Sequence, residues 1–413
     1  MHVLAGRAAE KRVRALAARA SRLDAVEPQV RRIVADVRGN RDRALVKYAR
    51  KWDGLQAGQP LRVAPSEIRA AWKAARPELR SALERAAANI RRFCEWQKPT
   101  EWMRKDSGIS LGQLVRPLHS VGCYVPGGRY PLPSTLLMTV IPAQVAGVGE
   151  ICVVSPNPRP ETLAAAALLG VTEFYRIGGA HAIAALAYGT ESIPHVDKIV
   201  GPGNLYVTAA KKLVAFDCSI DFLAGPTEVV IVAERGEAAF IAADLVAQAE
   251  HDPETLPVFI SSSRTLAEEV AARADEMAKN NVMARQSLAA NGVALVGASH
   301  AQALDWANLV APEHITVARG DVSAIRSAGS VFVGDYSPQA VGDYASGPNH
   351  VLPTAGAARY RGGLSVLDFL KLITVQELSP TALRRIAPVV TRLAEAEGLQ
   401  AHAESVRVRC ANA

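Results

Sequence analysis

At residues 174–188 the chain reads FYRIGGAHAIAALAY. A short apolar run is followed by two glycines and then by a segment rich in alanine and leucine, which predicts a buried strand, a tight turn and a helix. The same order recurs at residues 198–216, where KIV precedes GPGN and another helical segment. Strands that alternate with helices in this way predict a parallel, doubly wound sheet.

The alternation of strands and helices continues on both sides of this stretch. Further short strands are expected at residues 151–155, 229–232, 258–260, 293–296, 315–317 and 331–333. The chain from residue 1 to about 95, and again from about 380 onward, instead carries apolar residues at helical spacing. The predicted fold class is therefore α/β, with two Rossmann-like doubly wound domains and helical N- and C-terminal extensions.

Composition places the chain among ordinary globular enzymes. Of its 413 residues 49% are hydrophobic and 21% are charged, and the net charge is +7. The basic excess is dispersed, and its densest region, Arg7 to Arg50, has the spacing of solvated helix faces. With only 5% aromatic residues there is no stacking platform for nucleic acid, and no run of 18 apolar residues suggests a membrane span.

Cysteine usage predicts a reducing compartment. The five cysteines form no C-x-x-C pair, and an odd number gives no disulfide framework. Residues 1–20 carry arginine throughout and lack the continuous apolar core of a secretory signal. A cytoplasmic location is expected.

Three glycine-rich junctions predict a ligand crevice. They are YVPGG at residues 124–128, IGGAH at 177–181 and VGPGN at 200–204, whereas no G-x-G-x-x-G follows a strand. Glycine lets the backbone approach a ligand, and a helix N-terminus favours phosphate. One such junction is most simply a tight turn. Three within 80 residues favour a crevice at the carboxyl ends of the strands.

Four polar segments place an acid or amide close to a histidine. In AQAEHD, residues 247–252, Gln248 and His251 are three apart and share a helix face. Both side chains can bind a divalent metal, but two ligands do not hold zinc. Further candidates lie in PEH at 312–314, GDYASGPNH at 342–350 and EGLQAH at 397–402. A lone histidine is usually a packed or surface residue, so these segments carry weight only as a set.

Together, these strings and AGPTE at residues 224–228 closely resemble those of the L-histidinol dehydrogenase family, over about residues 25 to 405. The resemblance implies a zinc- and NAD-dependent enzyme that oxidises L-histidinol to L-histidine through histidinal, using two NAD, in the last step of histidine biosynthesis. It also implies a homodimer in which the C-terminal tail completes the neighbour's active site.

The resemblance assigns roles to individual residues. The implied metal ligands are Gln248, His251, Asp343 and His402. The implied acid–base pair is Glu313 and His314. Implied substrate contacts are Thr227, His314, His350 and Glu397, together with the four metal ligands. The implied NAD contacts are Tyr124, His181 and Asn204.

The same resemblance suggests a division of the chain. Residues 1–24 would form a helical arm, 25–123 and 229–365 a discontinuous zinc and catalytic α/β domain, and 124–228 an NAD-binding Rossmann-like domain. Residues 366–413 would form a helical tail that crosses the dimer.

Two residues depart from the family's usual pattern. His181 stands where glutamine is usual, which changes reach and can add charge at an NAD contact, and Thr227 replaces serine but keeps the hydroxyl. These departures leave open a paralogous zinc- and NAD-dependent dehydrogenase of another polar alcohol, such as a sulfonated diol. A non-catalytic metal- or nucleotide-binding protein is a third reading, against which the intact Glu313–His314 pair argues.

The residue types suit the implied chemistry. A histidine can take the hydroxyl proton during alcohol oxidation, and His314 is the expected base. Glu313 is expected to activate the water that hydrates the aldehyde, and zinc to orient the substrate. Cys123 is a less favoured nucleophile for aldehyde oxidation, because no base or charge partner for it is visible in the sequence.

Overall fold

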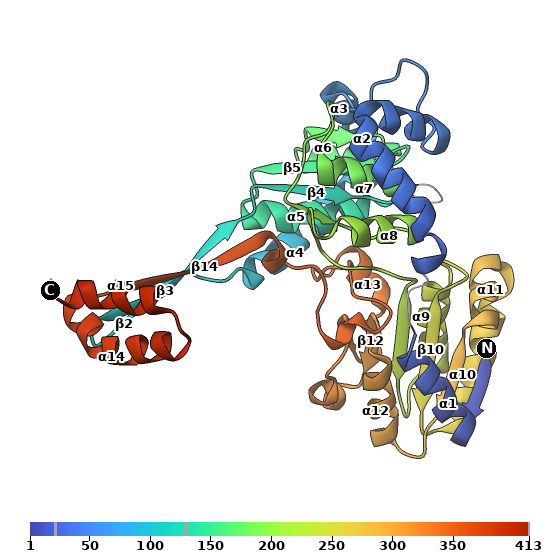
Figure 1. The fold of residues 1–413 in the computed structure, drawn as a ribbon. Coiled ribbons are helices and arrows are strands. Elements are labelled where there is room, and N and C mark those ends of the chain that lie inside the picture. The colour runs from blue at the N-terminus through green and yellow to red at the C-terminus, as the bar shows by residue number, and fades with distance from the viewer. Residues whose placement is uncertain (20–22, 128–130, 412–413) are drawn as a thin grey trace. The chain divides into compact units, whose positions relative to one another are not determined.

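A computed structural model describes residues 1–19, 23–127 and 131–411, so Gly128, in the junction at residues 124–128, lies outside the described residues. The chain divides into two compact units. The main unit comprises residues 1–97 and 119–369, and the C-terminal unit comprises residues 98–118 and 370–413. Figure 1 shows the helices and strands of each. Among the described residues no helix is both long and apolar enough to cross a bilayer.

Sheet A of the main unit is a parallel six-stranded sheet. Its strands, in spatial order, are β1 (His2–Ala5), β11 (Val293–Val296), β10 (Leu256–Ser261), β9 (Glu228–Val232), β12 (His314–Val317) and β13 (Ser330–Val333). Its helices are α1 (Gly6–Ala17), α9 (Ala238–Ala249), α10 (Arg264–Met277), α11 (Val282–Ala290), α12 (His300–Val310) and α13 (Gln339–Tyr344).

Alternation along β9 shows why both faces of sheet A are covered by helices. Val230 and Val232 pack with α1 and α12, whereas Val229 and Ile231 pack with α9 and α10. Because successive side chains of a strand point to opposite faces, an all-apolar strand needs a helical layer on each side. This is the doubly wound arrangement that the sequence predicts.

Sheet B of the main unit is a parallel five-stranded sheet. Its order is β6 (Glu173–Tyr175), β5 (Glu150–Val154), β4 (Ser120–Tyr124), β7 (Lys198–Val200) and β8 (Ser219–Ile220). The accompanying helices are α2 (Glu27–Trp52), α3 (Pro65–Ala74), α4 (Pro77–Gln97), α5 (Pro133–Ala146), α6 (Pro160–Leu168), α7 (Gly179–Tyr188) and α8 (Leu205–Val214).

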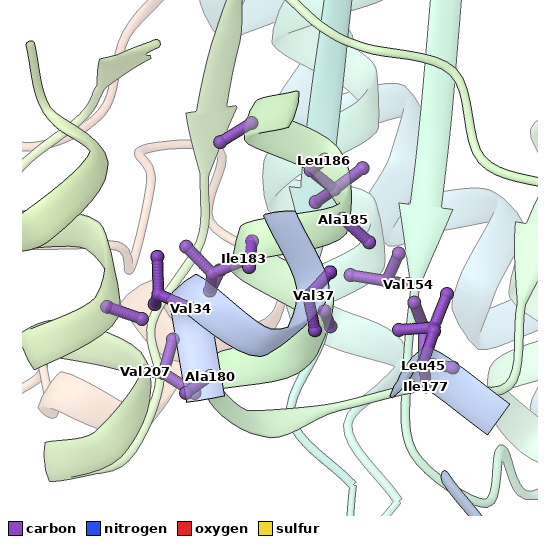
Figure 2. Packing of buried hydrophobic residues seen from close by; sticks show 14 of the residues in the cluster. Val34, Val37, Leu45, Val154, Ile177, Ala180, Ile183, Ala185, Leu186 and Val207 are labelled. Atoms are coloured by element: carbon purple, nitrogen blue, oxygen red, sulfur yellow. The ribbon is translucent and has the colours of Figure 1, made fainter. Parts of the chain in front are cut away.

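Helix α2 is anchored on sheet B through its apolar face. Figure 2 shows Val34, Val37 and Leu45 of α2 in one cluster with Ile183 and Leu186 of α7. These side chains are almost fully buried, and each contributes roughly 2 kcal/mol of transfer free energy. This packing holds the C-terminal end of α2 beside the start of α7, where the glycine-rich junction at residues 177–181 lies.

The C-terminal unit combines an antiparallel sheet with two helices. The strands, in spatial order, are β14 (Leu370–Leu378), β3 (Ile109–Pro117) and β2 (Trp102–Asp106), and the helices are α14 (Pro380–Ala396) and α15 (Gln400–Ala411). All nine residues of β14 pair with β3.

Both terminal extensions contain a strand that the helical spacing did not predict. β1 pairs with β11 at the edge of sheet A, and β14 pairs with a segment more than 250 residues away. β1 has only four residues, and β14 alternates weakly because most of its residues are exposed. Such strands are defined by their pairing partners rather than by local pattern.

Candidate active site

The predicted acid–base pair lies where β9 and β12 begin. The two strands are parallel neighbours, and His314 is opposite Val229. This register brings Thr227 and Glu228, at the start of β9, next to Glu313 and His314, at the start of β12. The cluster therefore lies at the amino-terminal edge of sheet A.

Glu313 is held by hydrogen bonds to one carboxylate oxygen. Its Oε2 accepts from Thr227 Oγ1 at 2.5 Å and from the backbone N–H of Glu228 at 2.9 Å. Gln248 in turn donates from Nε2 to Thr227 Oγ1. Among the described residues none donates to Glu313 Oε1. Burial raises the pKa of the Glu313 carboxyl above its usual value, although His314, Thr227 and the Glu228 N–H act in the opposite direction.

His314 has a defined tautomer. Its Nδ1 lies 3.1 Å from the backbone carbonyl oxygen of Glu228, which can only accept, so Nδ1 carries a hydrogen. Its Nε2 is buried without a hydrogen bond and lies 3.4 Å from Asp343 Oδ1. Burial alone would lower the pKa of His314, but the carboxylates of Glu313 and Asp343 raise it. Nε2 is therefore the nitrogen that can exchange a proton with a bound molecule.

Asp343 and His350 extend the cluster from α13 and the loop after it. His350 Nδ1 donates to the Asp343 backbone carbonyl at 2.7 Å, and His350 Nε2 lies 3.2 Å from Thr135 Oγ1. Burial would raise the pKa of Asp343, but the nearby His314, with His350 and His251, lowers it below its usual value. Asp343 thus presents an ionised carboxylate beside the acid–base pair.

The expected metal ligands come from both units. Gln248, in the last turn of α9, is buried, and His251, just after α9, is exposed. His402, in α15, and Glu397, which follows α14, are exposed residues of the C-terminal unit. Within the ranges described here, no three His, Cys, Asp or Glu side chains are gathered around a common point that could hold an ion.

Sequence analysis missed the side chain of Glu228, although it lies inside AGPTE. This buried carboxylate accepts two hydrogen bonds from one edge of the Arg19 guanidinium, from Nε at 2.6 Å and Nη2 at 2.5 Å, and accepts from the Ala355 N–H at 2.9 Å. Its backbone contacts Glu313 and His314 as described above. Arg19 is 209 residues away in sequence, so only the adjacency of Glu228 to Thr227 could have drawn attention to it.

The three predicted NAD contacts line one cavity. Tyr124, His181 and Asn204 lie around a space of about 550 Å³ at the carboxyl-terminal edge of sheet B. β4 and β7 are neighbours there, and the chain runs outward from them in opposite directions, which makes this the topological switch point of the sheet. Sequence analysis missed Asp53 and Trp52, which line the same cavity from the end of α2.

Glycine allows close backbone packing beside the cavity at the carboxyl-terminal edge of sheet B. Gly201 has φ +114°, and a Cβ there would lie 2.1 Å from the Tyr124 carbonyl oxygen, so the tight turn itself requires glycine. The Asn204 side chain caps α8 by accepting from the N–H groups of Tyr206 and Val207. The described residues of these junctions therefore include a tight turn at Gly201 and also border a cavity, and a ligand in it remains a prediction.

Two other features lie away from this chemistry. A second cavity, of about 600 Å³, opens at the carboxyl-terminal edge of sheet A, and none of the predicted site residues lines it. Cys123 is fully buried, and burial raises its pKa to about 12, which opposes a role as a thiolate nucleophile. All five cysteines are free thiols.

Comparison with known proteins decides the family. Residues 16–410 match the family model described as histidinol dehydrogenase. The chain belongs to this family. The histidinol dehydrogenase of Methanothermobacter thermautotrophicus is 46% identical over 402 residues, covering 94% of each chain, and that of Geobacter metallireducens is 43% identical over 400 residues, covering 93% of this chain and 92% of its own.

A solved structure gives the same result for the fold. The crystal structure of histidinol dehydrogenase from Elizabethkingia anophelis superposes with a TM-score of 0.94 at 35% identity, covering 100% of this chain and 98% of the other. The histidinol dehydrogenase family is one of NAD-dependent oxidoreductases. Membership therefore confirms the expected fold class and enzyme class.

Proposed function

We propose that the chain oxidises L-histidinol to L-histidine through histidinal, with two NAD per turnover, in the last step of histidine biosynthesis. The observation that carries this proposal is the Glu313–His314 pair, buried and mutually positioned in a chain of the histidinol dehydrogenase family. NAD, when bound, accepts a hydride in each of the two oxidations. The chain's own residues must move the protons.

His314 is the base of the first oxidation. Because Nδ1 is occupied by the Glu228 carbonyl, the hydroxyl proton of the alcohol goes to Nε2 as the hydride leaves the carbon. Burial would lower the pKa of His314, but the carboxylates of Glu313 and Asp343 hold it high. A cation bound by Asp343 would offset the charge of that carboxylate and make His314 a better proton acceptor near neutral pH.

Glu313 activates water for the second oxidation. Thr227 and the Glu228 N–H both engage Oε2, so Oε1 is the oxygen that can take a proton from water attacking the aldehyde. The pKa of this carboxyl is raised by burial, which strengthens it as a base. The resulting hydrate then loses the second hydride.

Gln248, His251, Asp343 and His402 would hold a zinc ion, whose role would be to orient the substrate. The donor set suits a borderline cation. The Gln248 amide donates its N–H to Thr227, which leaves its Oε1 for a metal, and the carboxylate of Asp343 has a lowered pKa. Substrate contacts from Thr227, His350 and Glu397 complete this proposal.

Metal analysis tests the zinc assignment. Removing metal should abolish turnover, and zinc should restore it. The His251→Asn variant should bind well below one zinc per chain, measured by elemental analysis. Full metal content together with full activity in this variant would overturn the assignment.

The C-terminal unit supports a homodimer with shared active sites. The buried hydrophobic residues among its described part are only Ala382, Ala394 and Ala403. Large apolar side chains are instead exposed on its strands and helices, among them Met103, Leu372, Ile373, Val389 and Leu393. Covering this surface with a second copy would stabilise it, and Glu397 and His402 would then serve the neighbour's site. The same proposal includes a cytoplasmic location, because the cysteines are free thiols and the role is biosynthetic. It includes no nucleic-acid or membrane partner.

Complementation tests the shared site. His402→Ala and Glu313→Gln proteins are each expected to be inactive, but a mixed dimer would hold one site carrying both defects and one carrying neither. Mixing them under conditions that allow subunits to exchange should therefore recover activity, and each mixed dimer should approach half the activity of a wild-type dimer. Demonstrated exchange without recovery would place His402 in its own chain's site.

A substrate panel tests the reaction itself. The zinc-loaded protein should reduce two NAD for each L-histidinol converted to L-histidine, and should not turn over sulfonated diols. The names of the curated relatives do not favour the diol alternative. NAD reduction with a diol but not with L-histidinol would reverse the proposal.

A further inference from the structure

The cavity assigned to NAD contains a polar atom that lacks a partner. His181, in the first turn of α7, is 1% exposed, and its Nδ1 makes no hydrogen bond to any described residue. The ring lines the cavity. Gly179 lies directly beside this nitrogen, since a Cβ at that position would be in van der Waals contact with Nδ1, at 3.4 Å. A buried nitrogen without a partner costs free energy that a bound group in the cavity can recover.

The other nitrogen of His181 is fixed by Asp53, the residue that follows α2. Asp53 Oδ2 lies 2.7 Å from His181 Nε2 and 3.0 Å from the backbone nitrogen of Gly178. The two side chains are 5% and 1% exposed. An ionised carboxylate accepts both hydrogen bonds, so Nε2 carries the hydrogen. In the neutral ring Nδ1 is then an acceptor.

Aromatic side chains hold the ring in this orientation. The centroids of Tyr48 and Trp52 lie 5.7 and 5.8 Å from that of His181, and these two rings stack on each other. Lys47 and Lys51 lie over Tyr48 and Trp52 respectively. Asp53 is the carboxylate in direct contact with the imidazole, through Nε2.

We propose that Asp53 is a positioning residue for the dinucleotide: it fixes His181 so that Nδ1 accepts a hydrogen bond from the 2′-hydroxyl of the adenosine ribose. This inference rests on the proposed use of NAD. A hydroxyl can donate to Nδ1, whereas a phosphate group would meet an acceptor nitrogen backed by a carboxylate. The subsite therefore selects NAD, whose adenosine ribose carries a free 2′-hydroxyl, over NADP, which carries a phosphate at that position. The proposal also accounts for the histidine at position 181, because an imidazole can bind Asp53 through one nitrogen and the dinucleotide through the other.

Calorimetric titration of the full-length protein with NAD and with NADP tests the proposal. Wild type should prefer NAD. Asp53→Asn removes the charge and loosens the ring, so NAD should bind about tenfold more weakly while NADP is little affected, which lowers the preference by about tenfold. In the assay with L-histidinol, KM for NAD should rise while kcat at saturating NAD stays close to wild type.

Two further variants keep the test decisive. His181→Phe retains a ring among Tyr48 and Trp52 but lacks Nδ1, and should weaken NAD binding to the same extent. Asp42→Asn is the matched control, because this half-buried carboxylate of α2 accepts hydrogen bonds from Ser192 and does not line the cavity. It should leave both affinities unchanged.

The possible failures are distinguishable. A folded wild type that binds neither nucleotide would overturn the proposed NAD function. NAD binding and preference that stay at wild-type levels in Asp53→Asn and His181→Phe, with unchanged melting temperatures, would overturn only the role of Asp53. If Asp53→Asn does not fold, the titration of His181→Phe decides the question.

Discussion

Sheets A and B are both parallel and doubly wound, yet their candidate sites lie at opposite edges. In sheet B, Tyr124 ends β4, Asn204 lies shortly after β7, and both line a cavity at the carboxyl-terminal edge. In sheet A, Glu313 and His314 stand at the amino-terminal edge, although a cavity also opens at the carboxyl-terminal edge. The rule for ligand crevices thus locates the proposed nucleotide pocket but not the acid–base pair.

The difference follows from what each edge provides. At the carboxyl-terminal edge of sheet B, glycine turns and the starts of α7 and α8 leave space for a ligand. At the amino-terminal edge of sheet A, the first N–H and C=O of β9 bind the side chains of Glu313 and His314 directly. One edge borders a cavity, and the other fixes the two side chains of the proposed acid–base pair.

The largest expected effect is on the first oxidation. His314→Asn removes the nitrogen that takes the hydroxyl proton, so alcohol oxidation should slow by roughly 10²-fold or more. Single-turnover kinetics with L-histidinol measures this step. An unchanged rate would remove His314 from the role of base.

Glu313→Gln should act mainly on the second oxidation, because water is activated only after the aldehyde has formed. We expect oxidation of supplied histidinal to slow by about tenfold or more, and the alcohol step to slow less. Rates with alcohol and aldehyde supplied separately give the comparison. Equal loss in both steps, for both this variant and His314→Asn, would refute the division of labour.

Glu228→Gln should lower stability. The substitution leaves the guanidinium of Arg19, whose side chain is only 16% exposed, without its carboxylate partner. Because Arg19 keeps its backbone carbonyl acceptors, we expect a loss of about 2 kcal/mol in unfolding free energy, less than for a fully isolated buried charge. Denaturant unfolding measures it. Glu276→Gln, which breaks an exposed pair with Lys279, is the control and should leave the midpoint unchanged.

The smallest effect concerns the carboxyl-terminal edge of sheet A. A hydrogen bond to Asp321 raises the pKa of His300, and Glu234 adds to this effect. Burial acts in the opposite direction and offsets part of it. A raised folded-state pKa stabilises the protein below the unfolded value of about 6.5, and this advantage disappears as pH rises through the folded value. His300 is 38% exposed, so His300→Gln should cost less than about 1 kcal/mol at pH 5.5 and still less at pH 9. Urea unfolding at both values tests the sign, and a larger loss at pH 9 would contradict it.

Particular residues show how far the sequence predicts this molecule. Local glycine and apolar patterns predict the βα turns, and Tyr124, His181 and Asn204 do line one cavity. Asp53 and Arg19 could not be found in this way, because they act on residues 128 and 209 positions distant through contacts that only the fold creates. β14 was missed for a similar reason, since its pairing with β3 is non-local. Glu397 and His402 lie in the C-terminal unit, and their predicted role in a neighbouring chain's site requires an assembly that no local pattern specifies.

The division between the two edges can be tested most directly by measuring NAD affinity and the single-turnover rate of alcohol oxidation in two variants. The account predicts that His314→Asn loses roughly 10²-fold in rate while binding NAD like wild type. It predicts that Asp53→Asn binds NAD about tenfold more weakly but reaches a near-normal rate at saturating NAD. If each variant impaired binding and chemistry to the same degree, the separation of nucleotide binding from proton transfer would be contradicted.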